Sequence, residues 1–413
     1  MLSPMRGVLQ GNFLNRSIRQ NFLRNMSSTT EPTILFEQRR NLLVVELNRP
    51  KALNSLTTDM CKEMRNLLSS KINPPANSGT KSDPPVAAFV LKGRGGKAFC
   101  AGGDVKTIWQ GLMTSPDYEA DKFFRTEYYM NYLLGTSNAP QISIWDGIVM
   151  GGGVGISIFG EFRVATEKAL FAMPETAIGL FPDVGSSAWL PHLADGYGAY
   201  IGLSGCRLGP ADLVHTNIAT HFVQSDKIAD LERDIEANLP LDPVQSRRFI
   251  KDTLDRYQSI SSKPDISAAH IHRHKDAIQR IFGEDVKTVE EIFRLLEQEA
   301  ANSTSVENDD NSTSIWAQKT LKTLQKMSPT SLKITLAQLQ RGRELDLQEC
   351  LKMEFRMMMG CMANNDFKEG IRAVLVDKDN NPLWQPRTVD EVSNDAVESY
   401  FTHLGDRELI LGQ

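Results

Sequence analysis

Hydrophobic and polar residues near the start of the chain alternate in a pattern that predicts strands and helices in turn. Two short apolar runs within residues 34–48 predict strands, and Thr57 or Thr58 can cap a helix that follows them. The runs at 87–93 and 141–149 are almost wholly apolar, as expected for strands buried on both faces. Strands that alternate with helices indicate βαβ units and a largely parallel sheet.

The pattern changes in the second half of the chain. Beyond about residue 195 the strand signal weakens, and apolar residues recur mostly at helical spacing. Residues 302–314 read NSTSVENDDNSTS, a polar low-complexity tract that predicts an insertion. We therefore predict a core over 31–225 and a mainly helical C-terminal region over 226–413.

The first thirty residues differ in composition from the rest. Met1–Thr30 contains four arginines and no Asp or Glu, and a helix could gather most of its apolar residues on one side. An arginine-bearing amphipathic start without acids is typical of a mitochondrial presequence. Residues 1–30 are therefore predicted to direct the chain to the mitochondrial matrix, with a disordered basic tail as the alternative.

Composition excludes several classes of protein. The 413 residues are 41% hydrophobic and 23% charged, which is ordinary for a globular protein, and a net charge of −5 disfavours a nucleic-acid partner. No run approaches the roughly 20 apolar residues of a membrane-spanning helix, so no membrane partner is predicted. The five cysteines are odd in number and lack CxxC spacing, which disfavours a disulfide scaffold and a zinc site.

Two glycine clusters are candidates for binding chemistry. A strand ends near residue 93, the glycine-rich loop GRGGKAFCAGGD (93–104) follows, and a helix is predicted at 105–110. Gly147 and Gly151–Gly153 form a second such junction. Neither matches a nucleotide-binding motif. Backbone N–H groups at such turns could hold a phosphate or the oxyanion of an acyl transfer, although a lone glycine run more often serves only as a tight turn.

Two acids lie in an apolar segment that has no Lys or Arg. The segment is FAMPETAIGLFPDVG, and the acids are Glu175 and Asp183. Burial would raise the pKa of such carboxyl groups, which makes them catalytic candidates. The structural alternatives are a first-turn helix charge at Glu175 and a loop or cap residue at Asp183.

Other candidate residues carry less weight. His270, His272 and His274 form a short cluster that we interpret as surface histidines, with no third ligand type for a metal. Cys100 has no histidine in its motif context and is interpreted as a core residue. The HExxH and GxSxG motifs do not occur.

Taken in order, the segments LNRPKALN, GKAFCAGGD, MGGGVG and MPETAIGLFPD resemble the crotonase superfamily of acyl-CoA enzymes, over about residues 33–225. The later segments MSPTSLKIT and DFKEGIRAVLVDKDNNPLW are similar to its thioester-hydrolase branch, which extends the resemblance over almost the whole chain after residue 30. The resemblance implies a crotonase-like α/β fold, a spiral of ββα units with a C-terminal helical region.

The resemblance also implies roles for individual residues. The substrate would be a coenzyme A thioester, with no cofactor besides that CoA and no metal. Backbone N–H groups of Gly103 and Gly152 would form an oxyanion hole, Glu175 and Asp183 would be the catalytic carboxylates, and Glu127 would contact substrate. The residues implied in CoA binding are Lys51, Ala52, Leu53, Ala101 and Gly103.

One departure separates members of the superfamily. Enoyl-CoA hydratases use two glutamates, and the position of the first is Gly155 here, while the second aligns with Glu175. Asp183 stands where hydratases usually have glycine, and Asp146 where many hydrolase relatives have histidine. A hydratase needs both carboxylates around the alkene. The resemblance therefore implies hydrolysis of 3-hydroxyisobutyryl-CoA, a step of valine breakdown.

Two alternatives remain at the level of sequence. One is an enoyl-CoA hydratase or isomerase, which the glycine at position 155 disfavours. The other is a noncatalytic relative associated with the mitochondrial ribosome, which the retained carboxylates and glycines disfavour. The pattern does not indicate an oligomeric state.

Overall fold

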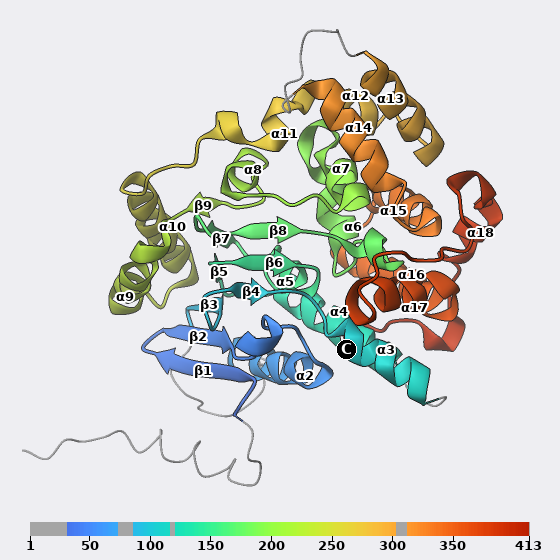
Figure 1. Cartoon of the computed structure of the whole chain (residues 1–413). Coiled ribbons are helices and arrows are strands. Elements are labelled where there is room, and N and C mark those ends of the chain that lie inside the picture. Colours follow the sequence, from blue (N-terminus) through green and yellow to red (C-terminus); the bar gives the residue numbers. More distant parts are fainter. Residues whose placement is uncertain (1–30, 73–85, 116–119, 303–311, 413) are drawn as a thin grey trace, which may run out of the picture. The chain divides into compact units, whose positions relative to one another are not determined.

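Two β-sheets form the centre of the fold (Figure 1). The computed structural model describes residues 31–72, 86–115, 120–302 and 312–412. In the larger sheet the strand order is β1-β2-β3-β5-β7-β9, with only β1 antiparallel to its neighbour, and the smaller sheet is parallel with order β4-β6-β8. The strands are β1 (Ile34–Arg39), β2 (Leu42–Leu47), β3 (Ala88–Gly93), β4 (Ala98–Cys100), β5 (Gln141–Trp145), β6 (Ile148–Met150), β7 (Phe162–Ala165), β8 (Leu170–Ala172) and β9 (His221–Phe222).

Successive segments of the chain add one strand to each sheet. β3 is followed by β4, β5 by β6 and β7 by β8, and the first strand of each pair joins the larger sheet while the second joins the smaller. Helices follow the pairs. This arrangement is the predicted ββα spiral, and its strand-to-helix turns are the points at which the glycine clusters occur.

Two strand predictions are wrong in detail. The apolar run 141–149 is not one strand, because the chain turns at Asp146 and Gly147 and enters the other sheet. Gly147 has φ +129°, and a Cβ atom there would lie 2.5 Å from the Lys97 carbonyl oxygen, so the turn requires glycine. Residues 98–100, interpreted as part of a loop, form the short strand β4.

The helices of the first half cover the sheets and carry the candidate site. Thr57 caps the first of them by accepting a hydrogen bond from the Met60 N–H, as predicted. The helices are α2 (Thr58–Leu67), α3 (Val105–Thr114), α4 (Asp121–Gly135), α5 (Gly152–Gly155), α6 (Ser186–Trp189), α7 (Tyr197–Ser204) and α8 (Pro210–His215).

From residue 228 to the end of the described chain the secondary structure is helical, as predicted. The helices are α9 (Ile228–Asn238), α10 (Pro243–Ser259), α11 (His270–Arg273), α12 (Lys275–Phe282), α13 (Val289–Ala301), α14 (Thr313–Leu324), α15 (Pro329–Gly342), α16 (Leu347–Ala363), α17 (Asn365–Ile371) and α18 (Asn394–Ser399). Thr313 and Ser314, placed in the predicted insertion, belong to α14 because Ser312 caps that helix. Residues 303–311 and the predicted presequence lie outside the described residues, and the boundary at 225 stays a prediction.

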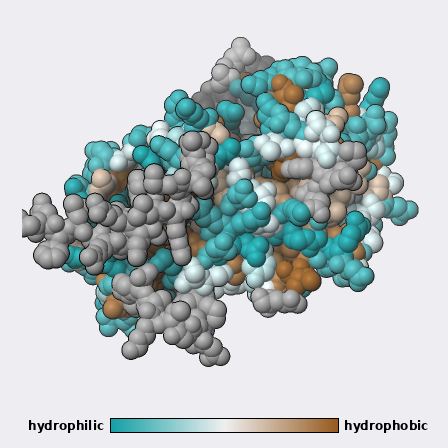
Figure 2. Space-filling model, turned by 90° about the horizontal axis from the view of Figure 1, so that it is seen from below, coloured by the Kyte–Doolittle hydropathy of each residue, from teal (hydrophilic) through white to brown (hydrophobic). Residues whose placement is uncertain are grey.

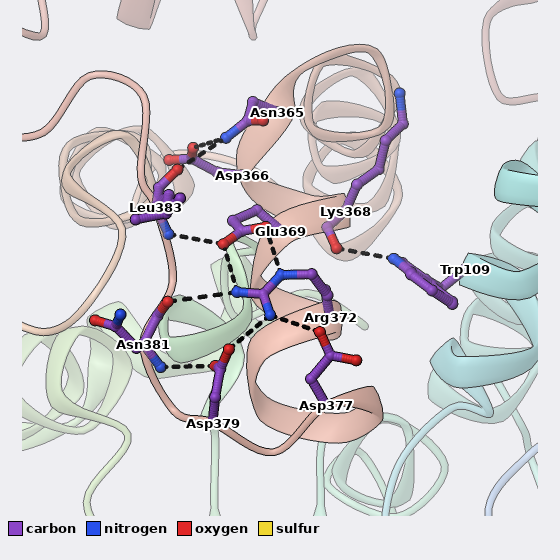
Figure 3. Close-up of polar contacts among 10 residues, drawn as sticks. All are labelled: Trp109, Asn365, Asp366, Lys368, Glu369, Arg372, Asp377, Asp379, Asn381 and Leu383. Carbon is purple, nitrogen blue, oxygen red and sulfur yellow. Dashed lines mark hydrogen bonds and ion pairs between the residues drawn. The ribbon is translucent and has the colours of Figure 1, made fainter.

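The C-terminal helices pack against the elements that carry the site. The Trp109 indole N–H on α3 donates to the Lys368 carbonyl on α17 at 2.8 Å (Figure 3). Near this contact, Arg372 binds the carboxylates of Glu369, Asp377 and Asp379, which fixes the turn after α17. α4 likewise packs against α16. The site is therefore supported by segments more than 200 residues away in sequence.

The histidine cluster is not a surface cluster. The His274 ring is buried and stacks on Trp316 at 5.1 Å between ring centroids, and a His270 ring nitrogen lies 2.7 Å from the Tyr200 hydroxyl. Only His272 of the three is exposed, as expected of one helix face turned inward and the other outward. All five cysteines are free thiols, and Cys100 is a core residue as predicted.

The surface agrees with the ordinary composition of the chain. On the face drawn in Figure 2, hydrophilic residues predominate among the coloured ones and hydrophobic residues form small separate groups. In the described part of the chain, no helix combines the length and the apolar character needed to cross a membrane.

Candidate active site

The first glycine loop is held by a turn from the β2–α2 connection. The Leu56 N–H donates to the Gly102 carbonyl at 2.9 Å, and the Asp104 N–H donates to the Leu56 carbonyl at 2.8 Å. This parallel bridge uses the residues on either side of Gly103 and not the Gly103 N–H itself. The Gly103 N–H is therefore left to face the other side of the loop.

The second glycine loop meets the first. Gly151 has φ +47°, and Gly152 is the first residue of α5, so its N–H has no partner within the helix. A Cβ atom at Gly152 would lie 3.1 Å from the Gly103 nitrogen and 2.5 Å from Glu127 Oε1. The structure thus brings the two predicted oxyanion glycines together beside the Glu127 carboxyl group.

Glu175 faces the same junction. It is buried at the first position of the short helix η3 (Glu175–Ile178), the first-turn position considered from the sequence. A Cβ atom at Gly151 would lie 2.9 Å from Glu175 Oε1, and the other carboxylate oxygen has no hydrogen-bond partner. Burial raises the pKa of Glu175 well above its ordinary value, and the nearby charge of Asp183 raises it further.

Asp183 is the second buried acid of the segment. Its carboxylate accepts a hydrogen bond of 2.8 Å from the Tyr128 hydroxyl, and its carbonyl accepts one from the Ser186 N–H at the start of α6. Burial raises the pKa of Asp183 to about 6, although the bond from Tyr128 opposes the rise. Asp183 therefore has the structural role at a turn that the sequence suggested, and it also belongs to an acidic cluster with Glu175 and Glu127.

Glu127 completes a cluster of three carboxyl groups. It lies on α4 with 2% of its surface exposed, and its Oε1 atom has no hydrogen-bond partner. Burial raises the pKa of Glu127 well above its ordinary value, and the nearby charges of Asp183 and Glu175 raise it further. No Lys or Arg is among the groups that shift these three pKa values. Buried carboxyl groups with raised pKa values are typical of sites that carry out proton transfer or nucleophilic attack.

A side chain at position 155 could not join the cluster. A Cβ atom at Gly155 would lie 2.4 Å from Val184 Cβ and 3.1 Å from Asn131 Nδ2. The distance to Val184 Cβ is shorter than the Cβ contacts found in proteins, so the space in front of this glycine is already filled. The structure therefore has no room for a second glutamate from α5.

Sequence reasoning missed the residues that hold the Asp183 turn. Glu354 on α16 is fully buried and accepts hydrogen bonds from the Gly185 N–H at 2.7 Å, the Ser187 N–H at 2.9 Å and the Ser187 hydroxyl at 2.7 Å. Gln338 on α15 donates to the Pro182 carbonyl at 2.5 Å. The one sequence signal for Glu354 was an acid within an apolar helical run.

The predicted CoA-binding segments lie side by side. Lys51 is exposed in the short helix η1 (Pro50–Ala52), Ala52 and Leu53 are half-buried, and the Ala101 N–H donates to the Leu53 carbonyl at 3.0 Å. Together they border the loop that carries Gly103. Their contact with coenzyme A stays a prediction.

Asp146 lies in the turn between β5 and β6. It accepts hydrogen bonds from the Thr166 hydroxyl at 2.8 Å and from Lys168 Nζ at 3.4 Å. These contacts tie the turn to the segment after β7. Asp146, which stands where many hydrolase relatives have histidine, therefore has a local structural role here.

Known proteins similar to this chain share both its length and its fold. A family model described as enoyl-CoA hydratase/isomerase matches residues 42–401. Proteins named mitochondrial 3-hydroxyisobutyryl-CoA hydrolase are 44% identical in Xenopus laevis, over 89% of this chain and 88% of that protein, and 41% identical in Homo sapiens, over 91% and 90%.

Two solved structures have the same fold as this chain. A carnitinyl-CoA dehydratase from Mycobacterium thermoresistibile has a TM-score of 0.77 at 31% identity, covering 92% of this chain and 99% of that one. An enoyl-CoA hydratase from Rhodobacter sphaeroides has a TM-score of 0.75 at 31% identity, covering 92% and 100%. By sequence and by fold, this chain belongs to the enoyl-CoA hydratase/isomerase family.

Proposed function

We propose that this chain hydrolyses 3-hydroxyisobutyryl-CoA to 3-hydroxyisobutyrate and CoA in mitochondria, as a step of valine breakdown. The observation that carries the proposal is the junction of the two glycine loops, where Gly152 lies next to the Gly103 nitrogen and Gly151 lies next to the Glu175 carboxyl group. At Gly155 there is no space for a second glutamate. Relatives over about 90% of the chain bear the name of this activity.

The oxyanion hole supplies electrostatic stabilisation. The thioester carbonyl oxygen accepts hydrogen bonds from the Gly103 and Gly152 N–H groups, which stabilise the negative charge as the carbonyl carbon becomes tetrahedral. The C–S bond then breaks and CoA leaves as a thiolate. Lys51, Ala52, Leu53 and Ala101 hold the CoA portion, which is part of the substrate, and the reaction needs no other cofactor.

Glu175 supplies the remaining chemistry by one of two routes. As a general base it takes a proton from water while the water oxygen attacks the carbonyl carbon. As a nucleophile its carboxylate attacks the same carbon, forms an acyl-enzyme anhydride and releases CoA, and water then opens the anhydride. Both routes require the ionised form. Asp183 orients the substrate or assists proton transfer, and Glu127 contacts the acyl group.

The proposal is tested by measuring free-thiol release from 3-hydroxyisobutyryl-CoA and 3-hydroxypropionyl-CoA by the purified chain. We expect turnover with the first and use the second to define the range of short acyl groups. If neither thioester is hydrolysed and the chain cosediments with mitochondrial ribosomal particles, the noncatalytic alternative replaces the proposal.

Mitochondrial import provides a second prediction. The acid-free, arginine-bearing residues 1–30 are expected to act as the presequence. Deleting them should abolish import of the chain into mitochondria while leaving thiol release by the purified enzyme intact. Protease protection of the full and truncated chains in isolated mitochondria measures this. Normal import of the truncated chain would refute the presequence.

The acidic cluster predicts a change of pH dependence in Asp183→Asn. The Asp183 charge raises the pKa of Glu175, so removing that charge should lower the pKa. Because Glu175 acts in its ionised form, the acidic limb of kcat/KM should move to lower pH. A pH–rate profile of both enzymes measures this, with Asp230→Asn on the exposed face of α9 as the matched control. An unmoved limb, or one moved to higher pH, would contradict the coupling.

A further inference from the structure

Asn131 is a fully buried side chain with an unused amide. It lies on α4, has no exposed surface, and neither its Nδ2 nor its Oδ1 atom has a hydrogen-bond partner. Both a donor and an acceptor are therefore unsatisfied at one buried position. Buried polar groups are almost always paired, so the exception calls for an explanation.

Folding alone does not explain this residue. An unpaired buried amide costs free energy that a leucine of similar size would not cost, and leucine is also the better helix former. Residues that conflict with the local rules of stability in this way are expected at functional sites.

The position of Asn131 connects it to the acidic cluster. It follows Glu127 by four residues and Tyr128 by three, so the three side chains lie on one face of α4. Tyr128 holds the Asp183 carboxylate. Asn131 Nδ2 also lies 3.1 Å from the point where a Cβ at Gly155 would be, and the Cβ atom of Val184, the neighbour of Asp183, lies 2.4 Å from the same point.

We infer that the Asn131 carboxamide binds the hydroxyl group of the acyl chain and so makes the enzyme selective for 3-hydroxyacyl thioesters. This inference rests on the proposed function. A hydroxyl both donates and accepts hydrogen bonds, which matches the free donor and free acceptor of the amide. An ionised Asp183 can only accept, so it cannot supply a donor to the hydroxyl oxygen.

The selectivity is measured in Asn131→Leu with two thioesters that differ only in the hydroxyl, 3-hydroxyisobutyryl-CoA and isobutyryl-CoA. We expect kcat/KM to fall by about 10–100-fold for the first and to change little for the second, because losing a hydrogen bond to a buried partner has an effect of that order. The temperature of thermal unfolding should stay the same or rise, because the unpaired amide is gone.

The matched control is Thr335→Val, which removes another buried and unpartnered polar atom, on α15. It should leave the ratio of the two kcat/KM values unchanged. If Asn131→Leu folds poorly, Asn131→Ala should show the same loss of preference.

Each of the following results would overturn the inference. An equal loss on both thioesters, or an unchanged ratio with a lowered unfolding temperature, would assign Asn131 a structural role such as holding a buried water. If the wild-type enzyme hydrolyses 3-hydroxyisobutyryl-CoA while the ratio is insensitive to Asn131, the proposed function stands and only this inference fails. If the wild type hydrolyses neither thioester, both fail.

Discussion

Replacing Glu175 by Gln should lower the turnover of 3-hydroxyisobutyryl-CoA by at least about 100-fold, the scale of a general-base contribution. The amide keeps the size of the carboxyl group, but it can neither attack as a carboxylate nor take a proton from water. Glu297→Gln, the same change on the exposed face of α13, should leave turnover unchanged. Rates of thiol release at saturating substrate measure both variants.

Labelled water distinguishes the two routes open to Glu175. In a single turnover in ¹⁸O-water, attack by Glu175 followed by water opening the anhydride at the enzyme's acyl carbon places label in the Glu175 carboxyl group. Direct attack by water places label only in the product acid. Mass spectrometry of the peptide and of the product reads both. Full activity in a folded Glu175→Gln enzyme would remove Glu175 from the reaction.

Replacing Gly152 by Pro should lower turnover by about 10²–10³-fold, the usual effect of losing one oxyanion-hole donor. Proline lacks the N–H, and the first residue of a helix, which Gly152 is in α5, is the helical position that accepts proline best. The added Cβ would nevertheless lie 2.5 Å from Glu127 Oε1, so crowding must be separated from loss of the donor.

Gly152→Ala provides that separation. Alanine adds the same Cβ atom but keeps the N–H. Thiol release by the two folded variants should show a further large loss from Ala to Pro. If the proline enzyme turns over substrate as fast as the alanine enzyme, the Gly152 N–H does not act in the transition state.

The acids of the site could be predicted from sequence because their setting is local. Glu175 and Asp183 lie in an apolar segment without Lys or Arg, and burial of that segment raises the pKa of both. The glycine-rich turns were equally visible. Their junction, however, depends on the spiral, which places two strand-to-helix turns together although about 50 residues separate Gly103 from Gly152. The family resemblance supplied that step.

Residues that act through long-range packing could not be predicted. Glu354 accepts a hydrogen bond from the Gly185 N–H, which is 169 residues away in sequence. The residues that flank Glu354 in the sequence do not indicate this partner. Asn131 is an ordinary helix residue until its burial is known. The prediction of surface histidines was wrong for the same reason, because only the packing of the α11 region against α14 stacks His274 on Trp316.

The turn at Gly147 escaped prediction for a different reason. Apolar residues occur on both sides of Asp146 and Gly147 in the run 141–149, and hydrophobic pattern alone does not show where a buried chain leaves one sheet for another. The positive φ of Gly147 reflects contact with the Lys97 carbonyl, which is itself a feature of the finished fold.

The central claim is that this site hydrolyses a thioester and does not hydrate an alkene. The most direct test incubates one preparation of the enzyme with 3-hydroxyisobutyryl-CoA and with crotonyl-CoA, measuring thiol release from the first and loss of the conjugated double bond of the second. We predict rapid thiol release and negligible hydration, because no second glutamate fits at Gly155. Rapid hydration of crotonyl-CoA without thiol release from 3-hydroxyisobutyryl-CoA would contradict the account.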